Sequence, residues 1–379
     1  MRSIRALVLF VVAGSAAWAG SAVSDWERRI AGGTLADDSA NYAEAERLFS
    51  LACDLEHGES LGSERLTRGC LLLARTYSVQ GKLLKAASTA DALLAVLESL
   101  EDPRAVDLVQ TLTEAASVQA ARADFAQSEA KVAAAVRLCR QLKPMDQARA
   151  FAQLASFFIP ADKQARGGNF LRASVAALKA WRNWNDPYFA ETAVDVGRTL
   201  KLFQRNSEAL EVLYSVVDAA RLRAESAPEF DELWRHYGAA VDVAVPILRA
   251  RGESAEAKRW LAARETWPQP PSSVLKLQPG DVAPQLERKA AAPFSLGAER
   301  RNVQGVVVLT AEIRPDGRAH RVRVLRPLPY GLTWSAIGAA RRWRFRPGMR
   351  DGKPTAINVQ IEVEFRSPPR QLLASVIPE

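Results

Sequence analysis

The 379-residue sequence has few of the residues that most often bind metals or react with substrates. It contains three cysteines and three histidines, with no CxxC or HExxH spacing, which argues against structural zinc. The GxGxxG and phosphate-loop motifs are also missing, and neither His57 nor His236 has a nucleophile at a telling spacing. We therefore expect a protein that is not an enzyme, with no catalytic residue, no metal and no cofactor.

Long apolar runs are missing after residue 24, so we expect no membrane span there. The chain begins with a short basic stretch, followed by the apolar run Ala6–Ala19, which ends in Ala17-Trp18-Ala19. This pattern predicts a signal peptide over residues 1–19 and a mature protein in the periplasm. The alternative is an uncleaved anchor in the inner membrane with the rest of the chain facing the periplasm, because apolar character persists to Val23. Membrane contact is expected only in that second case.

The odd number of cysteines implies at least one free or intermolecular thiol. Cys53 and Cys70 are the candidate internal pair. The interpretation we favour is that these two and Cys139 are all small buried hydrophobic residues on helices.

The sequence also lacks a large excess of one sign of charge, since it has 51 Lys and Arg and 43 Asp and Glu, a net charge of +8. This excess does not by itself indicate a nucleic-acid partner. Apolar residues make up 48% of the chain and charged residues 25%, which is typical of globular proteins. The length exceeds that of one ordinary core, so we expect two or more units.

Residues 25–264 have a helical, alanine-rich pattern in which one spacing recurs. In each repeat a small, a large and a small residue follow one another at the spacing of Ala45, Phe49 and Ala52. The residue twelve positions before the first of these three is small in most repeats, as Gly33 is. The pattern predicts about six helical hairpins at a period near 41 residues. It resembles divergent tetratricopeptide repeats, whose hairpins stack into a solenoid because one hairpin cannot bury its own apolar stripe. Such a solenoid either binds a partner on its concave surface or acts as a spacer.

Six prolines lie between Thr266 and Ser295, where they discourage regular structure. We predict a linker over residues 265–296, long enough to let the two halves of the chain move relative to each other.

The C-terminal part reads as strand, strand, helix and strand. Residues 302–317 contain an alternating strand and a turn, residues 320–326 alternate again, and Thr333 can cap a helix. The run INVQIEVEF over 357–365 alternates strictly. We expect a small α+β unit with a three-stranded antiparallel sheet, one face of which is covered by helix.

Spaced residues in this unit resemble the TonB C-terminal domain family. Ala298 lies seven residues before Gly305, Asp316-Gly317 stands at the turn, and ARRWRFRPGMRDGKP over 340–354 matches the family signature. The resemblance covers about residues 295–366. The expected organisation is thus α+β and multidomain, with an all-α repeat domain over 25–264, a TonB-like domain over 297–367 and a tail over 368–379.

The resemblance implies a periplasmic protein–protein interaction adaptor whose domain binds an extended peptide segment, such as that of an outer-membrane transporter, by strand addition. The alternative it implies is an energy transducer for outer-membrane transport with an uncleaved N-terminal anchor. The final strand has no proline between Ala356 and Ser367, and such a strand at a sheet edge offers its backbone to an incoming strand. The predicted binding residues are Ile357, Asn358, Val359, Gln360, Ile361 and Glu362.

Residues 298–366 contain 14 Lys and Arg against 6 Asp and Glu, a net charge of +8. Such a domain attracts acidic segments. Basic residues also surround two aromatic ones at 341–346, and we interpret them as a solvated basic surface rather than as a nucleic-acid site, which the predicted signal peptide disfavours. The predicted basic surface consists of Arg341, Arg342, Arg344 and Arg346.

Overall fold

A computed structural model of the chain describes residues 25–54, 62–158, 164–181, 187–224, 232–267 and 280–366. The predicted signal peptide over 1–19 and the predicted tail over 368–379 lie outside these residues. Within the described ranges, no helix combines the length and the apolar character needed to cross a membrane.

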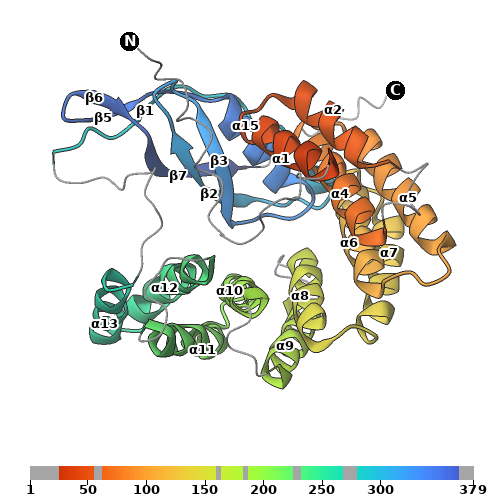
Figure 1. Cartoon of the computed structure of the whole chain (residues 1–379), viewed down its shortest axis with the longest axis horizontal. Helices are drawn as coiled ribbons and strands as arrows, with labels where there is room; N and C mark the ends of the chain where they lie inside the picture. The colour runs from red at the N-terminus through yellow and green to blue at the C-terminus, as the bar shows by residue number, and fades with distance from the viewer. Residues whose placement is uncertain are drawn as a thin grey trace, which may run out of the picture.

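The described part of residues 25–267 forms six helical hairpins, which confirms the number predicted from the repeating spacing. Figure 1 shows that they follow one another along an arc, from α1 and α2 to α12 and α13. The short 3₁₀ helix η1 (Ser156–Phe158) follows α8. The six pairs are α1 (Asp25–Asp38) with α2 (Tyr42–Ala52), α4 (Ser63–Val79) with α5 (Leu83–Ser99), α6 (Ala105–Ala121) with α7 (Phe125–Cys139), α8 (Pro144–Ala155) with α9 (Gln164–Ala180), α10 (Pro187–Leu202) with α11 (Asn206–Ala224), and α12 (Glu232–Ala250) with α13 (Ser254–Glu265).

The small residues of the repeat lie where two helices of a hairpin cross closely. A Cβ atom built on Gly33 would lie 2.5 Å from the Phe49 ring, and one built on Gly197 would lie 2.9 Å from Leu213. Both pairs are separated by the same number of residues, so the same crossing recurs in different hairpins. A larger side chain at either glycine would force its neighbour to shift, so a small residue favours the close crossing.

The cysteines differ from the favoured interpretation. Cys53 and Cys70 form a disulfide between the end of α2 and α4, whereas Cys139 is free and buried, as expected. The reason is the close approach of the two backbones, since a Cβ atom on Gly69 would lie 2.5 Å from the carbonyl oxygen of Ala52. Sequence spacing alone does not reveal such an approach between separate helices.

The C-terminal domain contains the predicted three-stranded antiparallel sheet, in the order β3-β2-β7. Its strands are β2 (Gly305–Ile313), β3 (Ala319–Arg326) and β7 (Ile357–Phe365). The pairing of β2 with β7 is regular along all nine residues, whereas the pairing of β2 with β3 has two irregularities. Helices α14 (Leu296–Arg300) and α15 (Leu332–Arg342) complete the unit.

One face of the sheet packs on α15, as the alternation predicted. The buried β2 residues Val307, Leu309 and Ile313 share one hydrophobic core with Ala336 and Ala340 of α15. Polar side chains of β7 lie on the opposite, open face.

The predicted linker over 265–296 is too long, because its described C-terminal part belongs to the C-terminal domain. Strand β1 (Gln285–Arg288) pairs with β4 (Arg344–Arg346), and Arg350 Nε donates a hydrogen bond to Asp281 at 2.9 Å. Prolines are compatible with this arrangement because an edge strand bonds on one side only. The hairpin of β5 (Gly348–Arg350) and β6 (Lys353–Thr355) lies beside it.

The C-terminal domain packs against the first hairpins of the solenoid (Figure 1). Residues 334, 338 and 341 of α15 share a second helix face, opposite the sheet. Trp334 packs against the solenoid cluster of Ala86, Ala87 and Val118, and a Cβ atom on Gly338 would lie 2.5 Å from the Val79 carbonyl oxygen. The sequence predicted two halves that can move relative to each other, and the structure instead brings them into close contact.

Candidate functional site

Strand β7 lies at one edge of the three-stranded sheet. Its nine residues pair with β2 on one side, and no strand of the described ranges pairs with its other side. In an antiparallel sheet, alternate residues of an edge strand direct both N–H and C=O away from the neighbouring strand. β7 therefore has a row of backbone donors and acceptors that an added strand can bind.

Buried apolar side chains anchor the edge strand β7 to the core of the domain. Ile357, Ile361 and Phe365 are buried, and the Phe365 ring meets the Phe294 ring edge-on at 5.4 Å between centroids. Val359, expected on the same inward face, is only half-buried. The apolar residues of β7 thus fix the strand, and its backbone remains the group that faces a partner.

The polar side chains of β7 lie on the open face of the sheet. Asn358, Gln360 and Glu362 are all exposed, and Gln360 Nε2 donates to Glu362 Oε1 at 3.2 Å. Farther along the strand, Glu364 is paired with Arg366 at 2.7 Å. The three predicted binding residues with polar side chains therefore lie together on one accessible surface, where they can contribute specificity to a bound segment.

The four residues of the predicted basic surface differ in exposure, and the placement of Arg341 on a solvated surface is wrong. Arg342 and Arg346 are exposed and Arg344 is half-buried, but Arg341 is only 5% exposed. Its Nη2 lies 3.0 Å from Asp37 Oδ2 in α1. The reason is that α15 lies between the sheet and the solenoid, so the residue belongs to a domain interface that its own local sequence does not reveal.

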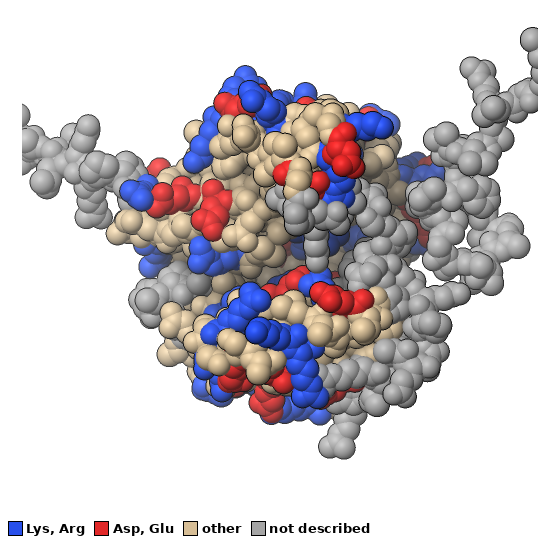
Figure 2. Space-filling view, turned by 90° about the vertical axis from the view of Figure 1, so that its left-hand side faces the viewer, with Lys and Arg blue, Asp and Glu red and all other residues tan. Residues whose placement is uncertain are grey.

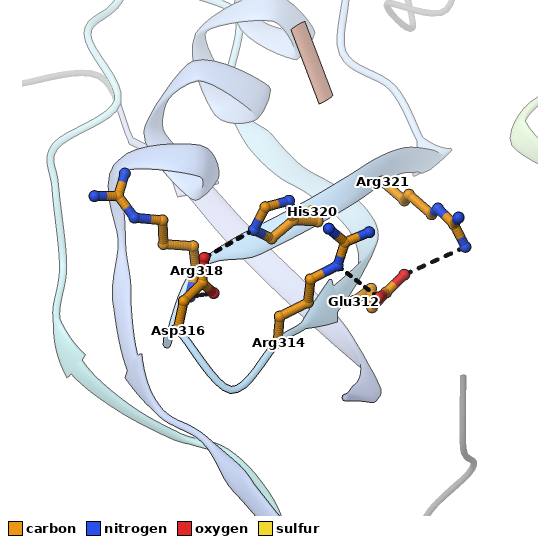
Figure 3. Close-up of polar contacts among 6 residues, drawn as sticks. All are labelled: Glu312, Arg314, Asp316, Arg318, His320 and Arg321. Carbon is orange, nitrogen blue, oxygen red and sulfur yellow. Dashed lines mark hydrogen bonds and ion pairs between the residues drawn. The ribbon is translucent and has the colours of Figure 1, made fainter. Parts of the chain in front are cut away.

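Sequence reasoning missed a polar cluster at the turn between β2 and β3 (Figure 3). The buried Glu312 carboxylate accepts a hydrogen bond from Arg314 Nε at 2.8 Å and lies 3.5 Å from Arg321 Nη1. His320 faces Glu312 across the strands, and its Nε2 lies 3.2 Å from Asp316 Oδ2. The sequence did contain a signal, because polar or charged residues occupy every second position from 312 to 320. Strand alternation alone, however, predicts that such residues face solvent.

The charged groups of this cluster contact one another within the β2–β3 hairpin. Burial acts to raise the pKa of Asp316, but the backbone N–H of Arg318 and the His320 ring outweigh it, so that the pKa of this carboxyl lies below its ordinary value. The charged groups face one another within the hairpin (Figure 3), and none of them is a nucleophile beside a base. Across the described ranges, no three His, Cys, Asp or Glu side chains come together in a way that would hold a metal ion.

Comparison with known families supports the assignment of the C-terminal domain. Residues 291–367 match the family model described as "Gram-negative bacterial TonB protein C-terminal". The matched range begins after β1 and includes all three strands of the main sheet. This region therefore resembles the TonB C-terminal domain family, and six helical hairpins of the described ranges precede it. No curated protein matches the sequence.

Two of the solved structures similar to this chain share little sequence identity with it. BtubC (BKLC) from P. vanneervenii is 16% identical, covers 68% of this chain and 98% of its own, and gives a TM-score of 0.41. A kinesin light chain with nearly identical TPR-like repeats from Podosopora anserina is 18% identical, covers 54% of this chain and 95% of its own, and gives a TM-score of 0.36.

Proposed function

We propose that this chain is a non-enzymatic periplasmic adaptor whose TonB-like domain binds an extended segment of a partner protein by strand addition to β7. One observation carries the proposal: β7 is a regular, proline-free edge strand. A partner strand that pairs with it would satisfy its outward backbone groups in the way β2 satisfies its inward ones.

The affinity of such a complex would come mainly from the backbone. Each hydrogen bond contributes on the order of 1 kcal/mol net, so a few bonds along one edge give a reversible complex. The basic character of the domain, with 14 Lys and Arg against 6 Asp and Glu over 298–366, favours encounter with acidic segments. Selectivity would come from the exposed side chains at 358, 360 and 362.

A location in the cell envelope agrees with three features. The TonB-like domain is typical of envelope proteins, the sequence begins with a predicted signal peptide, and the chain contains a disulfide between Cys53 and Cys70. Disulfides persist mainly in oxidising compartments such as the periplasm.

The alternative is an energy transducer for outer-membrane transport with an uncleaved anchor. The adaptor and the transducer differ in whether the N-terminal apolar segment is cleaved from the mature protein. Mass spectrometry that finds Gly20 as the first residue removes the transducer, and recovery of Met1 in the membrane fraction removes the adaptor as stated. We favour the adaptor because the N-terminal apolar segment contains no histidine, whereas the motor-coupled helix of the TonB family carries one.

The strand-addition proposal is tested by a proline scan of residues 358, 359, 361 and 362 in the full chain. Proline removes one N–H, so at positions directed toward β2 it destabilises the sheet, and at positions directed outward it leaves folding intact. We expect the outward positions to lose capture of envelope partners by a photo-crosslinker placed at Gln360. Arg323→Pro on β3, the opposite edge, serves as the matched control. Unchanged crosslinking in every folded proline variant of β7 would refute strand addition.

A further inference from the structure

The end of β3 faces the helix α10 of the solenoid. Arg326, the last residue of β3, is exposed, and its Nε donates to the Val306 carbonyl at 3.1 Å. Lys201 lies in the last turn of α10 and is also exposed. Figure 1 shows α10 beneath this end of the sheet, and Figure 2 shows a hollow between the two parts of the molecule.

The two cations lie close enough to repel each other. Partial burial lowers the pKa of the Lys201 ammonium, and the positive charge of Arg326 lowers it further. Two like charges that face each other across a partly desolvated gap form a place where an anionic group is stabilised.

Three carboxylates of α10 and β7 are paired with other cations. In α8 and α10, Arg149 pairs with Glu191 at 3.5 Å and Arg198 pairs with Asp195 at 3.0 Å. In β7, Glu364 pairs with Arg366. Among the described residues, neither Lys201 nor Arg326 takes part in an ion pair. The positive charge at this gap is therefore available to a ligand.

An apolar pocket continues from the end of β3. The loop that follows Arg326 lines a cavity of about 190 Å³ together with α6 and the residues after α8. Its walls include Leu328, Trp334 and Phe157. The hydroxyls of Ser117 and Ser156 at the pocket already donate to backbone carbonyls of their own helices. The cavity thus suits an apolar side chain rather than a polar one.

We propose that this junction, which we call the seam cleft (Lys201, Arg326, Leu328, Trp334 and Phe157), is a second protein-binding surface that takes an acidic segment carrying a bulky apolar residue. Carboxylates of the segment lie between the two cations, and the apolar side chain fills the pocket. Charge complementarity selects this occupant. The seam cleft is separate from β7, because it lies at the opposite edge of the sheet.

The test uses the full chain and three fluorescein-labelled synthetic peptides. The first has glutamates around one central phenylalanine, the second replaces every glutamate with lysine, and the third replaces the phenylalanine with glycine. We expect binding of the first peptide, weakened by salt, and at least tenfold weaker binding of the other two, because a hydrogen-bonded charge or a filled pocket contributes more than about 1.4 kcal/mol.

Charge-reversal variants locate the site. Lys201→Glu and Arg326→Glu are each expected to weaken binding of the first peptide at least tenfold, whereas Lys258→Glu on α13 leaves it unchanged. A folded β7 proline variant is also expected to bind the peptide normally, which separates this site from strand addition. Equal binding of the glutamate and lysine peptides, or equal affinity of the Lys201, Arg326 and Lys258 variants, would overturn the proposal. Circular dichroism confirms that each variant is folded.

Discussion

Replacement of Arg341 by methionine is expected to loosen the C-terminal domain from the solenoid. The guanidinium is 5% exposed and lies 3.0 Å from Asp37 and 3.7 Å from Asp38. Burial acts to lower its pKa, but the charge of Asp37 and its contacts raise it above the ordinary value. Methionine keeps most of the side-chain volume and leaves the two carboxylates without their cation.

The size of the expected loss in unfolding free energy depends on how exposed Asp37 and Asp38 are. Removal of one member of a fully buried ion pair costs about 3 to 5 kcal/mol. Here the Asp37 and Asp38 side chains are 23% and 37% exposed, and Arg341 Nε and Nη1 have no hydrogen-bond partner within the described structure. Water therefore stabilises the orphaned carboxylates in part, and we expect a loss of about 2 kcal/mol.

Urea unfolding combined with hydrogen exchange measures this loss. We expect a lower free energy of unfolding and faster exchange of α15 amides, by about 30-fold if exchange requires undocking. Arg342→Met is the matched control: Arg342 is exposed, its Nη2 donates to the Ala291 carbonyl at 3.2 Å, and this change should cost less than about 0.5 kcal/mol.

A double-mutant cycle with Asp37→Asn isolates the pair itself. The two single changes should be non-additive, because either one alone removes the same interaction. Should Arg341→Met be no more destabilising than Arg342→Met, or should the cycle give no coupling, then Arg341 does not hold the two domains together.

Three further predictions concern the solenoid. Cys70→Ser or Cys53→Ser should lower the free energy of unfolding by about 3 kcal/mol in urea titrations, since the disulfide closes a short loop, and dithiothreitol should have the same effect on the unmodified chain. Burial raises the pKa of the Cys139 thiol to about 11, so it should react with Ellman's reagent at pH 8 only after unfolding; immediate reaction would contradict its burial. Burial also raises the pKa of Asp38 above 3.8, so protonation of this group stabilises the folded chain at low pH, and that stabilisation is lost as the pH rises through the folded-state pKa. Asp38→Asn should accordingly raise the free energy of unfolding near pH 7 but not near pH 3, and a decrease near pH 7 would contradict the sign.

Much of the fold was predictable from local spacing. The repeated small-large-small pattern predicted the hairpins because one helix turn brings residues three and four apart onto one face. The alternation of Val307, Leu309 and Ile313 predicted β2 because successive strand side chains point to opposite faces. The TonB resemblance rested on residues that the hairpin turn and the end of α15 require, such as Gly317 and Trp343.

The candidate edge was only half predictable. The absence of proline in 357–365 showed that every residue can donate an N–H, but whether this strand lies at an edge depends on strand order. The order β3-β2-β7 comes from the packing of all three strands on α15. Arg341 was misassigned for the same reason. Helix α15 packs against the sheet on one face and against the solenoid on the other, so it buries a second face that the local sequence pattern predicts to be exposed to water.

By itself, the sequence determined the repeats, the strands and the likeness of residues 295–366 to a TonB C-terminal domain. These properties depend on residues near one another in the chain, where helix and strand periods apply directly. Only the tertiary structure decided the disulfide, the edge position of β7, the docking through Arg341 and the seam cleft between Lys201 and Arg326. Each of these joins segments far apart in sequence, and their approach is set by the packing of whole elements rather than by local spacing.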